Sequence, residues 1–148
     1  MEDAFSRAIA ALRRKERSVS ELDAWLLKRG VSADERQNIL DRLLDLEELD
    51  DERFAQRFAE DKRELAGWGG ERIREALLAR QVDAQTIESV LSADGEQEQL
   101  GRAAALLESR GTELADDAAR ARALAFLTRR GYAYEIAHSA ISQAERPA

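Results

Sequence analysis

Apolar residues along the chain recur at intervals of three and four positions, the spacing that places them on one face of an α-helix. Leu22, Trp25 and Leu26 follow this spacing in one segment, and Ile73 and Leu77 follow it in another. The segments between them carry polar caps and glycines. The pattern therefore predicts short amphipathic helices joined by tight turns.

This helical pattern occurs three times. Segments that begin at Glu21, Arg72 and Arg122, and so lie 51 and 50 residues apart, align without gaps. Each segment reads as a helix, a stop and a second helix, which is the signature of an internal repeat. The three stops are Gly30, Gln81 and Gly131.

The residues around each stop predict how one helix ends and the next begins. The two glycines suit the left-handed conformation that follows many helices, whereas Gln81 would be strained there, so we expect the middle stop to differ in shape. Ser32, in a capping box, and Asp83 are suited to cap the helices that follow. Ala133 cannot cap the third, which should fray more.

A further helix precedes each pair. In the middle copy Asp50 is placed to cap it, and Leu49 is placed to pack onto Phe54 as a hydrophobic staple. Phe54, Phe58 and Leu65 form its apolar stripe. The corresponding stripes are Phe5, Ile9 and Leu12 in the first copy and Leu100, Ala104 and Leu107 in the third.

These segments predict an all-α chain of three tandem three-helix repeats that form an elongated, curved array. The predicted units are 1–48, 49–94 and 95–148. A unit of this size buries little apolar surface, so neighbouring units should stabilise each other.

Trp68 lies between glycines, in Gly67-Trp68-Gly69-Gly70. Gly67 ends the preceding helix, and the glycines turn the chain. The tryptophan has two interpretations. It covers the hydrophobic core of the middle unit, or it is an exposed docking residue of the kind that dominates protein interfaces.

Composition narrows the setting. Of 148 residues, 36% are charged and the net charge is −7, which disfavours a protein that simply coats nucleic acid. Positive charge is nevertheless concentrated locally, since residues 1–30 hold seven Lys and Arg against five acids. The chain has no cysteine and no apolar run near the roughly 18 residues of a membrane span. We expect a cytoplasmic protein without a membrane segment.

The sequence offers little catalytic chemistry. His138 is the single histidine, and helical spacing beside Ile141 suits a surface or core-edge role. The acids Asp50, Asp51 and Glu52 fit the first turn of a helix. No glycine-rich phosphate loop, thiolate site or converging acid set stands out. The chain is therefore predicted not to be an enzyme and to need no cofactor or metal.

The middle copy carries a resemblance to a known family. "LDDERFAQRFAEDK" from Leu49 and "GWGGERIREALLARQV" from Gly67 resemble the RecX family of recombination regulators. In the first copy, Ser20-Glu21-Leu22 and the segment from Leu26 to Gly30 are similar to the first repeat of that family. The resemblance spans nearly the whole chain and is strongest in the middle repeat.

The resemblance implies a function and a partner. RecX proteins bind the RecA recombinase, especially its filament on single-stranded DNA, and lie along the filament groove. They lower strand exchange, ATP hydrolysis and the co-protease activity that triggers the SOS response. By this resemblance the chain is a regulator of DNA repair, with at most weak direct contact to DNA.

Two other interpretations stay open. Three short helices can form a helix-turn-helix-like module that binds DNA directly, although the third helices here are acidic or neutral. The chain could also be a helical scaffold without a preferred partner. The arginines lie on the middle helices, where they bind the partner or are simply solvated at helix ends. The candidate partner-binding residues are Trp68, Lys28, Arg29, Arg72, Arg74, Arg80, Arg122, Arg129 and Arg130.

Overall fold

The structure is a computed structural model that describes residues 3–146. Within that range the chain forms nine helices and no strand, which confirms the all-α prediction. The helices are α1 (Ala4–Arg14), α2 (Val19–Lys28), α3 (Ala33–Asp45), α4 (Asp51–Ala66), α5 (Gly70–Ala79), α6 (Ala84–Ser92), α7 (Glu96–Ser109), α8 (Asp117–Arg129) and α9 (Tyr134–Glu145).

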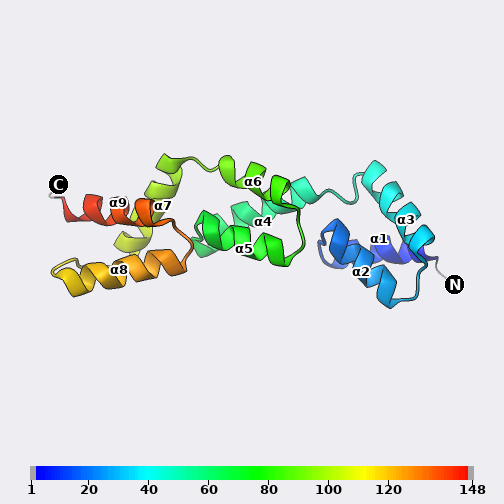
Figure 1. Ribbon diagram of the computed structural model, residues 1–148, viewed down its shortest axis with the longest axis horizontal. Coiled ribbons are helices and arrows are strands. Elements are labelled where there is room, and N and C mark those ends of the chain that lie inside the picture. Colours follow the sequence, from blue (N-terminus) through cyan, green and yellow to red (C-terminus); the bar gives the residue numbers. More distant parts are fainter. Residues whose placement is uncertain (1–2, 147–148) are drawn as a thin grey trace.

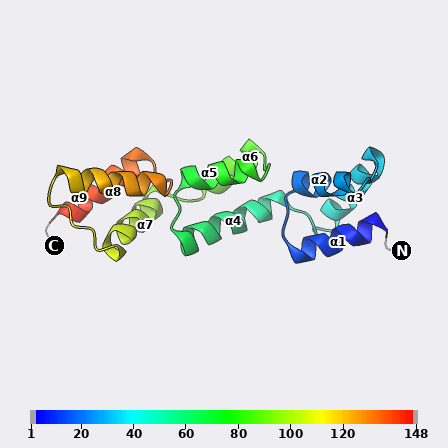
Figure 2. The ribbon, with the colours of Figure 1, turned by 90° about the horizontal axis from the view of Figure 1, so that it is seen from below.

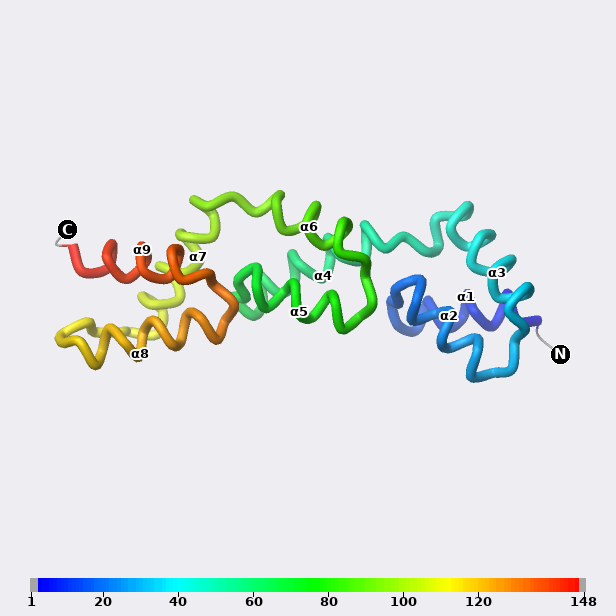
Figure 3. Tube along the Cα trace, viewed as in Figure 1, coloured from blue at the N-terminus to red at the C-terminus, as the bar shows by residue number. Residues whose placement is uncertain are grey.

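Three separate hydrophobic cores divide these helices into groups of three. One core lies among α1–α3, a second among α4–α6 and a third among α7–α9. The groups follow one another in an elongated row, with the two ends of the chain at opposite ends of the molecule (Figures 1 and 3). Below, the groups are called the first, second and third units.

The middle helix of each unit continues the line of its neighbour. Seen from below, α8, α5 and α2 form one row, and α7, α4 and α1 form a second row beside it (Figure 2). The C-terminal end of α8 meets the N-terminal end of α5, and the C-terminal end of α5 meets the N-terminal end of α2, so the helix dipoles are aligned head to tail. This row positions most of the candidate residues.

The helix caps follow the sequence closely. Asp50 and Asp83 accept hydrogen bonds from backbone N–H groups three residues on, at 3.1 and 2.9 Å, and Ser32 does the same at 3.2 Å. The reciprocal capping box, however, forms at Ser18 with Glu21 rather than at Ser32. Side-chain caps therefore define the starts of α2, α3, α4 and α6.

The three stops are alike in shape. Gly30 and Gly131 have φ values of 77° and 100°, and Gln81 has a φ of 62°. The expectation that the middle stop would differ is therefore wrong. A glutamine accepts the left-handed conformation there, at a steric cost that glycine avoids.

Two apolar residues lie elsewhere than predicted. Leu65, expected in the stripe of α4, is 84% exposed. Leu49, expected to pack onto Phe54, belongs to the first core, whereas Phe54 belongs to the second. The predicted stripe holds for the first half of α4, where Phe54 is buried and Phe58 packs against the same core.

Candidate partner-binding surface

The first unit meets the second at the N-terminal end of α2. Ser18, which is completely buried, donates its hydroxyl to the backbone carbonyl of Arg80 at 2.8 Å. The backbone N–H of Val19 donates to the Asp51 carboxylate at 2.9 Å. The first N–H groups of a helix have no acceptor within the helix. For Val19, the neighbouring unit supplies that acceptor through Asp51.

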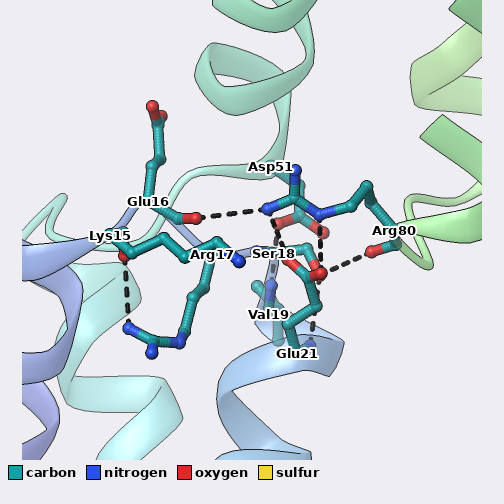
Figure 4. A network of polar contacts seen from close by, with 8 residues as sticks. All are labelled: Lys15, Glu16, Arg17, Ser18, Val19, Glu21, Asp51 and Arg80. Carbon is teal, nitrogen blue, oxygen red and sulfur yellow. Dashed lines mark hydrogen bonds and ion pairs between the residues drawn. The ribbon is translucent and has the colours of Figure 1, made fainter. Parts of the chain in front are cut away.

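The side chain of Arg80 closes this joint (Figure 4). Its guanidinium donates to both carboxylate oxygens of Glu21, at 2.6 and 3.0 Å, and to the carbonyl of Glu16 at 3.3 Å. Burial alone would raise the pKa of Glu21, but the bonds from Arg80 and from the Ser18 N–H hold that pKa below its usual value. At Asp51 burial prevails and raises the pKa.

The second unit meets the third through backbone groups. The N–H of Gly69 donates to the carbonyl of Arg130 at 2.8 Å, and the N–H of Glu71 donates to the carbonyl of Gly131 at 2.9 Å. A Cβ atom on Gly131 would lie 2.5 Å from the Cβ of Arg72. Only glycine allows the two helix ends to approach this closely.

Two side chains of the third unit reinforce that joint. The Arg130 guanidinium donates to the carbonyl of Ala66 at 2.6 Å, and the Tyr132 hydroxyl donates to the carbonyl of Gly67 at 2.9 Å. Burial raises the pKa of Tyr132. Together these bonds satisfy carbonyls at the end of α4 that the helix itself leaves unpaired.

Trp68 lies at the edge of the second core. Its ring meets Phe58 edge to face at 6.3 Å, and it is half-buried. Lys62 and Arg72 lie over the indole with their charged groups 4.7 and 4.3 Å from its centroid. The arrangement matches the interpretation of Trp68 as a cover for the core, and Arg72 reaches the surface beside it.

The other candidates fall into two groups. The guanidinium of Arg74 donates to the carboxylate of Glu88 at 2.8 and 3.0 Å and to that of Glu71 at 2.5 Å, and these bonds raise the pKa of Arg74. The guanidinium groups of Arg74, Arg80 and Arg130 therefore all donate hydrogen bonds to other groups of the chain. The exposed candidates are Lys28, Arg29, Arg72, Arg122 and Arg129.

The exposed candidates are distributed along the row of middle helices. Lys28 and Arg29 lie at the end of α2, where Arg29 stacks on Trp25 at 3.7 Å. Arg129 ends α8, and Arg122 lines a surface hollow near the other end of that helix. They do not converge on one pocket. The arrangement is a line of cations suited to an extended or repetitive partner rather than to a small molecule.

Sequence reasoning missed the residues that join the units. In the sequence, Glu21 stood out only as part of a family motif and Asp51 only as part of a helix start, and Ser18 and Tyr132 did not stand out. The alignment did contain a signal, because Ser18 and Gly69 lie 51 residues apart, at the same place before a middle helix. Both receive the end of the next middle helix.

Among residues 3–146, no cluster of three or more metal-binding side chains is suited to hold an ion. No helix in that range is both long and apolar enough to cross a membrane.

The fold and the joints define a class, the tandem arrays of three-helix units. Comparison with known proteins identifies the family within that class. Residues 50–91 match the family model described as "RecX, second three-helix domain". The regulatory protein RecX of Mycobacterium avium (strain 104) is 34% identical over 140 residues, which cover 92% of this chain and 81% of that protein.

Two further comparisons agree. The regulatory protein RecX of Trichlorobacter lovleyi is 30% identical over 141 residues and is covered to 90%, as is this chain. The crystal structure of RecX from Lactobacillus salivarius superposes with a TM-score of 0.87 over 94% of this chain and 92% of that one, at 19% identity. The chain therefore belongs to the RecX family of regulatory proteins.

Proposed function

We propose that the chain binds the RecA recombinase, above all the RecA filament on single-stranded DNA, and inhibits its recombinase, ATPase and co-protease activities. It would thereby modulate DNA repair and the SOS response in the cytoplasm. The observation that carries this proposal is membership of the RecX family along almost the entire chain. We propose that it acts by binding, not by catalysis.

The shape of the molecule supports a filamentous partner. A row of repeated units presents similar surfaces at regular intervals, which suits a partner that is itself a repeat of one subunit. The exposed cations Lys28, Arg72 and Arg129 lie on successive middle helices of that row. A filament on DNA carries the negative charge that such a line would attract.

Direct sequence-specific binding to DNA has less support. In a helix-turn-helix module the last helix enters the major groove. Here α3 carries Asp34, Glu35, Asp41 and Asp45. These carboxylates would be repelled by the phosphates.

The proposal is tested with RecA and single-stranded DNA. Substoichiometric amounts of the protein should slow ATP hydrolysis, and Lys28→Glu with Arg129→Glu should weaken the effect, most clearly at low salt. Equal charge reversal at Arg13 and Arg14, which lie off the middle-helix row, serves as the control. Unchanged ATP hydrolysis at a ratio of one to one would exclude RecA inhibition.

A further inference from the structure

A surface groove opens at the joint between the second and third units. It has a volume of about 320 Å³ and lies between the end of α4, the middle of α7 and the end of α8. Leu65, Ala66, Ala105 and Leu106 supply apolar walls. The contacts between the second and third units that are described above do not occupy this groove.

Leu65 is the main apolar feature of the groove. It is 84% exposed, more than any other large hydrophobic side chain among the described residues. A single exposed leucine is ordinary on a protein surface. Leu65, however, faces a hollow that also includes Leu106, whose side chain packs beneath the Gly67 turn. Leu65 and Leu106 therefore line the same hollow.

The groove is also positively charged. Arg63, Arg102 and Arg130 line it, and Glu64 is the only acid that does so. Nearby, the buried carboxylate of Asp94 serves two of these arginines, at 3.4 Å from Arg63 and at 2.5 and 2.9 Å from Arg102.

The arginines outnumber the acids that face them. Three guanidinium groups against the two carboxylates of Glu64 and Asp94 leave one excess positive charge. This charge lies in a chain whose net charge is −7. The Nε atom of Arg102 is buried without a hydrogen-bond partner, and that of Arg63 lies 3.4 Å from the Asp94 carboxylate. A partly desolvated guanidinium attracts a carboxylate more strongly than an exposed one does.

We propose that this groove binds an extended acidic segment of a protein partner. An aliphatic side chain of the segment packs against Leu65 and Leu106, and its carboxylates face Arg130, whose guanidinium, unlike those of Arg63 and Arg102, makes no ion pair with Asp94. Nucleic acid fits less well, because a sugar-phosphate backbone gains nothing from the leucines. The proposal goes beyond RecA binding, since it locates a docking groove and the chemistry of what enters it.

The test uses a labelled peptide in which glutamates alternate with leucines, followed by fluorescence anisotropy. We expect it to bind, and to bind less well when its leucines become serines or its glutamates become glutamines. Leu65→Glu should weaken binding by about tenfold or more, because it removes a leucine contact and adds a repelling charge. Leu65→Ser should weaken it less.

The matched control is Leu78→Glu, an equally drastic change at an exposed leucine of α5 that does not line the groove. It should leave peptide affinity unchanged. Thermal melts establish that both variants fold, which their exposure favours. Because this assay contains no RecA, its result is independent of whether the chain inhibits RecA.

Three results would overturn the proposal. One is the absence of peptide binding to the wild-type chain. Another is equal weakening by Leu65→Glu and Leu78→Glu. The third is preferential binding of labelled oligothymidylate that Leu65→Lys strengthens and Leu65→Ser leaves unchanged, which would make the groove a phosphate-binding surface.

Discussion

At the scale of single residues, Gln81 holds a position that glycine holds in both other units. Its φ of 62° places a residue that has a β-carbon in the left-handed conformation, which costs about 1–2 kcal/mol. Glycine removes that strain but adds about 0.4–1 kcal/mol of unfolded-state entropy. Gln81→Gly should therefore stabilise the chain by about 0.5–1 kcal/mol in urea unfolding. A loss of stability would mean that the glutamine side chain makes a compensating contact.

Gly131 and Gly30 hold equivalent positions but face different surroundings. A Cβ on Gly30 would meet nothing within 4 Å, whereas one on Gly131 would lie 2.5 Å from the backbone N of Arg72. Gly30→Ala should cost the left-handed strain of about 1–2 kcal/mol, less the roughly 0.4–1 kcal/mol gained from lower unfolded-state entropy. Gly131→Ala should cost about 1–3 kcal/mol more, because the added β-carbon would overpack the second joint. Equal losses in chemical denaturation would show that the joint adapts freely.

One substitution can decide whether Trp68 covers the core or docks a partner. Because the ring is half-buried against Phe58, Trp68→Ala should lower the free energy of unfolding by about 2 kcal/mol, somewhat below the range for a fully buried tryptophan. Thermal melts measure this loss, and a RecA ATPase assay on the same variant measures docking. A stable variant with lost inhibition would instead identify a docking residue.

Sequence reasoning was most reliable for residues that act over three or four positions. Asp50 and Asp83 cap their helices as predicted, because a cap depends only on its own helix start. The prediction for Leu65 was wrong because an apolar stripe identifies a face of a helix but does not show where the helix that covers this face ends. α4 has 16 residues and its partner α6 has nine, so the last turn of α4 extends beyond the second core.

At the scale of elements, the two joints use different chemistry. The second joins backbone to backbone, at Gly69 and Gly131. The first depends on side chains, with Arg80 between Glu21 and the Glu16 carbonyl. These contacts link residues 59 to 64 positions apart, so no local pattern contains them. Only the repeat register, which aligns the helix ends, points toward them.

The side-chain joint should be sensitive to acid. The pKa of Glu21 is lower in the folded chain than its ordinary 4.5, so its ionised form favours folding. That stabilisation is present above about pH 4.5 and is lost as pH falls through the lowered pKa. Asp51, whose pKa is raised, has the opposite effect on the pH dependence of stability. It is present both in wild type and in a Glu21→Gln variant.

Glu21→Gln isolates this contribution. At pH 7 the variant should be less stable than wild type by about 1.5–3 kcal/mol, the worth of a hydrogen bond to a charged group. The difference should shrink as the pH is lowered well below 4.5, because wild type then loses the same charge. Thermal melts of both proteins across this range measure it. A difference that stays constant with pH would exclude the ion pair as its cause.

At the scale of the whole molecule, three small cores in a row replace the single core of an ordinary domain of this length. A single globule of 148 residues would have a radius of gyration of roughly 15 Å. The row of units should exceed this clearly in small-angle X-ray scattering, because its mass lies far from the centre along one axis (Figure 1). Arg80→Ala weakens the first joint but removes no core contact of α1–α3 or α7–α9. It should therefore broaden the distribution of interatomic distances at its long end without shortening the molecule. A wild-type value near 15 Å would mean that the units fold back on one another in solution, and the line of cations along α2, α5 and α8 would then not exist.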